Sequence, residues 1–73
     1  QLGEGEGSAK KAVEWFHKAA ELGDPHAHAR LGRIYLNGEG VPVNPGEAAK
    51  WFRMAAASGL PYAQFELANL YRD

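Results

Sequence analysis

The sequence reads WFRMAAASG at residues 51–59 and WFHKAAELG at residues 15–23, and this pair of stretches decides the fold. Both copies place Trp-Phe, then an Ala-Ala pair, then Gly at the same spacing, and they start 36 residues apart. A fixed period of this length is typical of repeat architectures, in which each unit is one supersecondary motif. The duplication therefore directs the search for function toward a repeat scaffold and away from a catalytic motif.

Helix signals surround the first copy. Apolar residues recur every three or four positions between Ala9 and Leu22, which predicts a helix that Ser8 caps and Gly23 ends. The preceding residues 1–7 are rich in Gly and Glu, and Gly loses too much entropy to hold a helix well. We therefore expect residues 1–7 to form a loop or to be disordered.

Three further helices are predicted downstream. Asp24 and Asn44 are natural N-caps, and each is followed by a proline, which suits the first helical position. The fourth helix starts at Pro61 without a usual cap, because Leu60 precedes it. The expected helices run from residue 9 to 22, from 25 up to a connection at 38–43, from 45 to 58, and from 61 onward. Short turns between them predict antiparallel neighbours.

The two copies share ten identical positions, and all ten are small, aliphatic, aromatic or turn residues. They are Ala12/Ala48, Trp15/Trp51, Phe16/Phe52, Ala19/Ala55, Ala20/Ala56, Gly23/Gly59, Pro25/Pro61, Ala27/Ala63, Leu31/Leu67 and Tyr35/Tyr71. Packing is therefore what has been duplicated, and we expect both Trp-Phe pairs to fill the space between helices. The solvent-facing residues differ between the copies, so any specificity is expected to lie in them.

Composition excludes several classes of protein. The 73 residues suffice for one small domain, and the absence of Cys excludes disulfides and thiolate metal sites. Eight basic and nine acidic residues are interspersed, which predicts no nucleic-acid partner. The apolar runs are far shorter than the roughly 20 residues of a membrane helix, so no membrane insertion is expected. No signal peptide is recognisable, and the start at Gln1 suggests a processed product or a piece of a longer chain.

The spacing of these residues resembles the Sel1-like repeats, relatives of the tetratricopeptide repeats. The family pattern is Ala-x3-Leu-Gly-x2-Tyr, then Gly-x-Gly-Val, then Ala-x2-Trp-x3-Ala-Ala-x2-Gly. Its positions are met here by Ala27, Leu31, Gly32, Tyr35, Gly38, Gly40, Val41, Ala48, Trp51, Ala55, Ala56 and Gly59. Two departures are that Ala68 stands where Gly32 stands in the complete repeat, and that the first loop is one residue shorter.

The resemblance implies an all-α fold: an α-solenoid (α-α superhelix) of antiparallel helix-turn-helix repeats, here with four helices. It divides the chain into a partial repeat at 1–23, a complete repeat at 24–59 and a partial repeat at 60–73, as a probable fragment of a longer array. It also implies a scaffold for protein–protein contacts, with the first helix of each repeat lining a concave face. The family motif is structural, so it implies no catalytic residue and no cofactor.

The candidate partner-binding residues lie on the two first helices, on the side opposite their core stripe. The first set is His26, Ala29, Arg30, Arg33 and Asn37, and the second is Tyr62, Phe65, Glu66, Asn69 and Asp73. Of these, His26, Arg30, Arg33, Tyr62, Phe65, Glu66 and Asn69 are the predicted partner-binding residues. Arg30 and Arg33 suit a carboxylate on a partner, because Arg offers a planar bidentate fork. A structural alternative is that Arg30 pairs with Glu66 and that a following helix covers Phe65.

Other sites are not supported by the sequence. His26 and His28 point about 200° apart on a helix, and His17 lies on another helix, so we expect all three to be solvent-facing and to bind no metal. The runs around Gly3 to Gly7 and Gly38 to Gly40 lack the strand and the Lys-Ser/Thr of a phosphate loop. No Ser-His-acid or Cys-His arrangement can be argued.

These observations predict a non-enzymatic interaction scaffold that binds a protein or peptide on its concave face. The alternative from another class is a structural spacer or a unit that self-associates through uncovered terminal helices. A small-molecule binder or hydrolase is a further alternative, and it requires a concave pocket with convergent polar groups.

Overall fold

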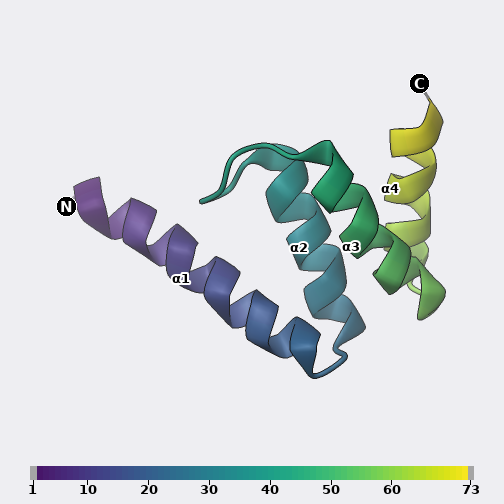
Figure 1. Cartoon of the computed structure of the whole chain (residues 1–73), viewed down its shortest axis with the longest axis horizontal. Coiled ribbons are helices and arrows are strands. Elements are labelled where there is room, and N and C mark those ends of the chain that lie inside the picture. Colours follow the sequence, from purple (N-terminus) through teal and green to yellow (C-terminus); the bar gives the residue numbers. More distant parts are fainter. Residues whose placement is uncertain (1, 73) are drawn as a thin grey trace.

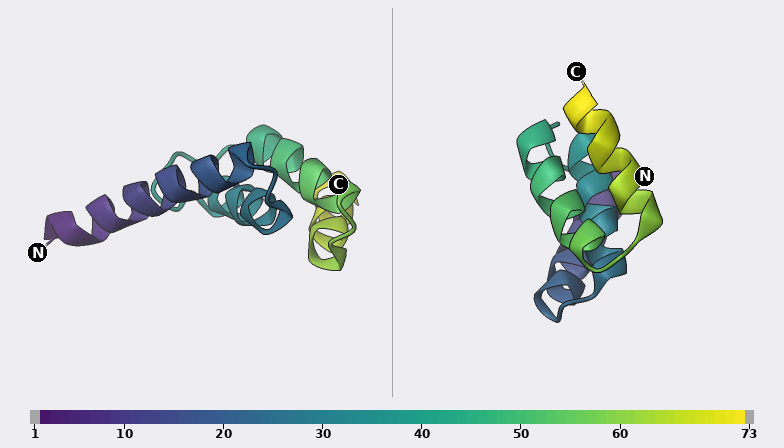
Figure 2. Two further views of the ribbon diagram at one scale, coloured as in Figure 1. Left: turned by 90° about the horizontal axis from the view of Figure 1, so that it is seen from below. Right: turned by 90° about the vertical axis from the view of Figure 1, so that its right-hand side faces the viewer.

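The structure, a computed structural model, describes the backbone of residues 2–72 and the side chains of residues 9–72. It consists of four helices joined by short connections: α1 (Leu2–Glu21), α2 (Pro25–Asn37), α3 (Pro45–Ala57) and α4 (Pro61–Arg72). Consecutive helices run antiparallel and follow one another around an arc (Figure 1). In the view from below, α1 and α3 lie on one side of this arc, and α2 and α4 lie on the other (Figure 2, left). The described residues form no strand, so the all-α solenoid prediction is confirmed.

Local signals place the helix ends close to where they were predicted. The Asp24 side chain accepts a hydrogen bond from the His26 amide, and the Asn44 side chain accepts one from the Glu47 amide. Both are N-caps that satisfy a helical N–H left without an intrahelical acceptor. Gly23 ends α1 with a φ of 86°, a conformation that residues with a Cβ rarely adopt.

The prediction of a loop is wrong for residues 2–7, because α1 starts at Leu2 and runs through Ser8 without a break; residue 1 lies outside the described residues. Adding residues to an existing helix gains one hydrogen bond each, whereas nucleation carries most of the cost. No proline interrupts this stretch, and its two Glu residues stand near the positive end of the helix dipole. Ser8 is consequently an interior helical residue and not a cap.

The core forms two adjacent clusters, one for each pair of packed repeat units. The first lies between α1 and α2 and contains Val13, Ala20, Ala27, Leu31 and Ile34. The second joins α2, α3 and α4 and contains Ala29, Ala48, Phe52, Ala55 and Ala63. Six of these ten residues are alanines, and small side chains allow helix axes to approach closely. Phe52 and Leu31 are the largest fully buried side chains.

Gly32 shows how tightly α2 and α3 approach. A Cβ built on Gly32 would lie 2.8 Å from three ring carbons of Phe52, closer than packed carbon atoms tolerate. The absence of a side chain at Gly32 is therefore what allows the Phe52 ring to lie flat against α2. The equivalent position on α4 is Ala68, which carries the Cβ that α2 lacks.

The expectation that both tryptophans fill space between helices holds for one copy only. Trp51 is half-buried and packs against the first core cluster, whereas Trp15 is 73% exposed. The residues that contact Trp51 lie on α1 and α2, 34 and 23 positions earlier in the chain. Equivalent positions for Trp15 fall before residue 1, so nothing in the described structure covers it.

Candidate interaction surface

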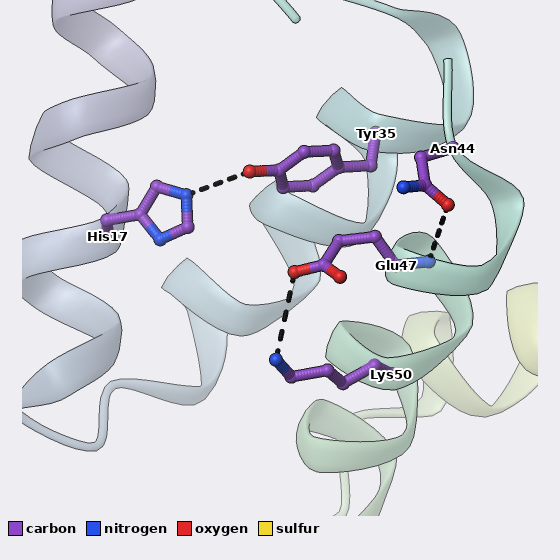
Figure 3. A network of polar contacts seen from close by, with 5 residues as sticks. All are labelled: His17, Tyr35, Asn44, Glu47 and Lys50. Carbon is purple, nitrogen blue, oxygen red and sulfur yellow. Dashed lines mark hydrogen bonds and ion pairs between the residues drawn. The ribbon is translucent and has the colours of Figure 1, made fainter. Parts of the chain in front are cut away.

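Two aromatic contacts of Trp51 hold α3 against α1 and α2, and a hydrogen bond joins α1 to α2 beside them. The Trp51 ring stacks on His28 of α2 at 5.6 Å between centroids, and it meets His17 of α1 edge-on, also at 5.6 Å. His17 Nε2 shares a 3.1 Å hydrogen bond with the Tyr35 hydroxyl (Figure 3). Edge-to-face and offset contacts of this kind are favoured by the ring quadrupoles. The indole of Trp51 therefore packs between two histidines, His17 of α1 and His28 of α2.

The histidines do not behave as the sequence predicted. His26 is exposed, but His17 is half-buried and His28 is 6% exposed, so the expectation of three solvent-facing rings is wrong. His28 Nε2–H donates to the Ala20 carbonyl near the end of α1, at 3.2 Å, which satisfies a carbonyl of the last turn. Among the described residues, no group of three or more His, Cys, Asp or Glu side chains could hold a metal ion.

The polar contacts repeat with the same period as the packing, although the side chains differ. The bond between His17 and Tyr35 recurs 36 residues later as a hydrogen bond from the Arg53 guanidinium to the Tyr71 hydroxyl. The bond from His28 to the Ala20 carbonyl likewise recurs, with Gln64 Nε2 donating to the Ala56 carbonyl at 3.4 Å. Sequence comparison missed these pairs because His, Arg and Gln are not identical, but a search for polar donors at equal offsets would have found them.

The predicted residues of α2 lie as expected, with one exception. His26, Arg30, Arg33 and Asn37 are exposed. Ala29 is 6% exposed and belongs to the second core cluster, so its placement on the outer face was wrong. The reason is that this side of α2 faces the second core cluster, in which Ala29 lies with Phe52 of α3 and Ala63 of α4.

The predicted residues of α4 are more varied. Tyr62, Phe65 and Asn69 are exposed, Glu66 is half-buried, and Asp73 lies outside the described residues. Tyr62 meets the buried ring of Phe52 edge-on at 6.1 Å, so only part of its surface is available. Phe65 is 63% exposed and occupies the position equivalent to the buried Ala29.

The two arginines border a small pocket between α1 and α2. The pocket has a volume of about 90 Å³ and is lined by Ala9, Ala12, Phe16, Arg30, Arg33, Ile34 and Glu39. The Arg30 guanidinium lies 5.6 Å from the centroid of the Phe16 ring, a cation–π contact. Among residues 9–72 the structure shows no ion pair between Arg30 and Glu66; the ion pair present there joins Lys50 to Glu47 at 3.7 Å (Figure 3). Both guanidinium groups thus reach solvent beside a recess that apolar side chains line together with Glu39.

We define the first-helix surface as the exposed or half-exposed residues of α2 and α4 on one side of the arc. They are His26, Arg30, Arg33, Tyr62, Glu66 and Asn69. Phe65 stays a predicted partner-binding residue, but it is not counted in this surface, because its equivalent Ala29 belongs to the second core cluster. None of the described helices has the length and apolarity needed to cross a membrane.

Comparison with known proteins agrees with this architecture. The Sel1 repeat matches the chain three times, at residues 1–24, 25–60 and 61–73. An uncharacterized protein of Neisseria meningitidis serogroup B is 50% identical over 34 residues, which is 47% of this chain and 7% of that protein. The chain thus spans only a small part of the curated relative that it matches. No solved structure matches the chain significantly. The three consecutive matches, the shared period and the antiparallel helices together show that the chain belongs to the Sel1 repeat family.

Proposed function

We propose that this chain is a non-enzymatic module that binds a partner protein or peptide on the first-helix surface. Sel1 repeats are generally protein–protein interaction modules, and this general role applies to the chain as a family member. We also propose that residues 24–59 form one complete repeat, with a second helix of another repeat before it and a first helix after it.

One observation carries the proposal: the side chains of the first-helix surface differ between the copies, whereas ten positions that serve packing and turns are identical. His26 is replaced by Tyr62, Arg30 by Glu66 and Arg33 by Asn69, 36 residues later in each case. The fold does not require a particular side chain at these positions, since α2 and α4 are both helical although their residues there differ. Residues that the fold leaves unconstrained are available for recognition.

The chemistry of the surface indicates the kind of partner. Arg30 and Arg33 stand one turn apart beside the recess that Phe16 and Glu39 also line. A guanidinium offers several donors in a plane and forms paired hydrogen bonds with a carboxylate. A segment that carries Asp or Glu next to a small apolar side chain therefore fits this part of the surface best.

The test is a selection from a displayed peptide library with the 73-residue chain, followed by affinity measurements on selected peptides. We expect enrichment of acidic residues beside an apolar residue, and binding that weakens as salt screens the charges. The double variant Arg30→Ala/Arg33→Ala should lower the affinity at least tenfold. The matched control Lys50→Ala removes an exposed positive charge from α3 and should leave the affinity unchanged.

The measurements are made at a concentration at which the chain is monomeric, so that self-association does not enter. Loss of binding in step with loss of helical signal would mean that the arginines are structural. Equal loss in the Lys50→Ala control would mean that binding is a general charge effect. Either result would refute the proposed surface.

A further inference from the structure

On the basis of the function proposed above, we propose that the two halves of the first-helix surface select opposite charges. The α2 half consists of His26, Arg30 and Arg33, and the α4 half consists of Tyr62, Glu66 and Asn69. Both helices lie on the same side of the arc (Figure 2, left). The partner that fits is a segment with an acidic part and a basic part, which lies across the two helices with its acidic part on α2.

Neither half owes its exposure to where the sequence begins or ends. Arg30 and Arg33 are exposed although α3 and α4 follow α2, so a following repeat does not cover these positions. Tyr62 and Asn69 are exposed although α2 and α3 precede α4, so a preceding repeat does not cover the equivalent positions either. The surface is therefore a feature of the repeat itself.

The charges of the two halves are opposite and are not neutralised by each other. Arg30 of α2 is replaced by Glu66 at the equivalent position of α4. The ion pair present among residues 9–72 joins Lys50 to Glu47, so neither guanidinium of the α2 half lies within 4.0 Å of the Glu66 carboxylate. Glu66 is half-buried, but its carboxylate is not one of the buried polar atoms that lack a partner, so it reaches water. Both signs of charge are thus available to a partner.

Glu39 weakens the positive charge of the α2 half but does not cancel it. It lines the same recess as Arg30 and Arg33, and within residues 9–72 it forms an ion pair with neither of them. Its carboxylate instead accepts a hydrogen bond of 3.1 Å from the Asn37 amide. Two guanidinium groups and one carboxylate leave one net positive charge beside the recess, so this half still attracts an acidic residue.

The α4 half carries the groups that bind a basic side chain. Tyr62 and Glu66 stand four positions apart on α4, so they lie one turn from each other on the same face. Tyr62 is 46% exposed and makes its edge-on contact with Phe52, which leaves part of its ring open. A cation is attracted to an aromatic face and to a carboxylate. Arg suits this pair better than Lys, because its planar guanidinium stacks on rings and forms paired hydrogen bonds with carboxylates.

This division of charge determines how a partner lies on the surface. In the opposite orientation, the acidic part of the partner would face Glu66 and its basic part would face Arg30 and Arg33, and like charges repel. Charge complementarity of this kind fixes orientation more than it raises affinity. We therefore expect each exposed charge pair to change the affinity by only about two- to fivefold, together with one clearly preferred orientation.

The test uses a synthetic peptide, the block peptide, in which a block of Glu and Leu residues is joined by a Gly-Ser linker to a block of Arg residues. A spin label is attached to its acidic end or to its basic end, and NMR shows which amide signals of the 73-residue chain the label broadens. We expect the label on the acidic end to broaden signals of α2 and the label on the basic end to broaden signals of α4. A peptide of the same composition in which Glu and Arg alternate should bind several-fold more weakly.

Two variants test the assigned charges. Glu66→Gln keeps the shape of the side chain and removes its charge, so it should weaken the block peptide about two- to fivefold and leave a peptide with the acidic block alone unaffected. The matched control Glu47→Gln removes a negative charge from α3 and should change neither affinity. Arg30→Glu/Glu66→Arg exchanges the charges of the two halves and should reverse the pattern of broadening. Circular dichroism checks that each variant is folded.

The outcomes separate this proposal from the function on which it rests. Equal broadening of α2 and α4 by both labels would overturn the division of charge, as would a pattern that the charge exchange leaves unchanged. Equal affinity for the block and alternating peptides, or no effect of Glu66→Gln, would also overturn it. Each of these results leaves the proposed function standing as long as the peptide with the acidic block alone still binds. Failure of that peptide to bind would instead contradict the proposed function.

Discussion

Replacing Trp51 and Trp15 by Ala, one at a time, compares how much each tryptophan contributes to the stability of the fold. Trp51 and Trp15 occupy equivalent positions of the repeated pattern, but Trp51 packs between His17 and His28, whereas Trp15 is 73% exposed. Any difference in the effect of Trp→Ala at the two sites must therefore come from tertiary packing.

The size of the effect follows from burial. Removing a buried aromatic side chain costs about 3–5 kcal/mol. Trp51 is only half-buried, so less apolar surface is lost on truncation than for a fully buried ring. Its Nε1 has no hydrogen-bond partner among the described residues, and removing this unsatisfied donor offsets part of the loss in stability. We expect Trp51→Ala to lower the free energy of unfolding by about 2–4 kcal/mol, relative to a total of ~4–11 kcal/mol for a domain of this size. Trp15→Ala should change it by less than about 0.5 kcal/mol.

The assay is thermal and urea unfolding followed by far-UV circular dichroism, which does not depend on the tryptophan signal. A loss of 2–4 kcal/mol corresponds to a fall in Tm of roughly 10–25 °C for a small domain, and Trp15→Ala should shift Tm by only a few degrees. Protein concentration is kept where the chain is monomeric. Equal destabilisation at both positions would refute the reasoning, because it would mean that Trp15 is packed in solution as Trp51 is.

Substitutions at three further positions test other contacts by the same unfolding assay. Gly32→Ala should destabilise the fold by about 1–3 kcal/mol, because the new methyl group overlaps the ring of Phe52; a gain in stability would contradict this packing. Asp24→Ala should cost about 1 kcal/mol through loss of the N-cap of α2, and no change would mean that the cap is not formed in solution. His28→Gln should cost less than His28→Ala, since Gln64 makes the equivalent bond in the other copy; the reverse order would show that the bond to the Ala20 carbonyl does not stabilise the fold.

Much of the fold was predictable because its signals are local. Each cap and each left-handed Gly is set by a few neighbouring residues, as Asp24, Asn44 and Gly59 show. Residues 2–8 were not predicted correctly. The prediction considered the low helix propensity of Gly but not that these residues extend a helix that is already nucleated by the residues after them. Propensity is a weak guide where a helix only needs to be extended.

The interaction surface was predicted less completely. Arg30, Arg33 and Asn69 are exposed as the helical period indicated, whereas Ala29 and His28 are buried. A helical period gives the face on which a residue lies, but a solenoid helix is covered on more than one face by its neighbours. The number of neighbours cannot be read from the period of a single helix.

The sequence by itself determined the repeat, the helices from residue 9 onward and the small residues that let them approach, because these depend on spacing and on local chemistry. Only the tertiary structure decided what each repeated residue does. Trp51 and Trp15 are equivalent in the repeated pattern, yet Trp51 packs against α1 and α2 and Trp15 is exposed. The physical reason is that burial depends on which helices stand beside a residue, and this is a property of the stack and not of the repeat.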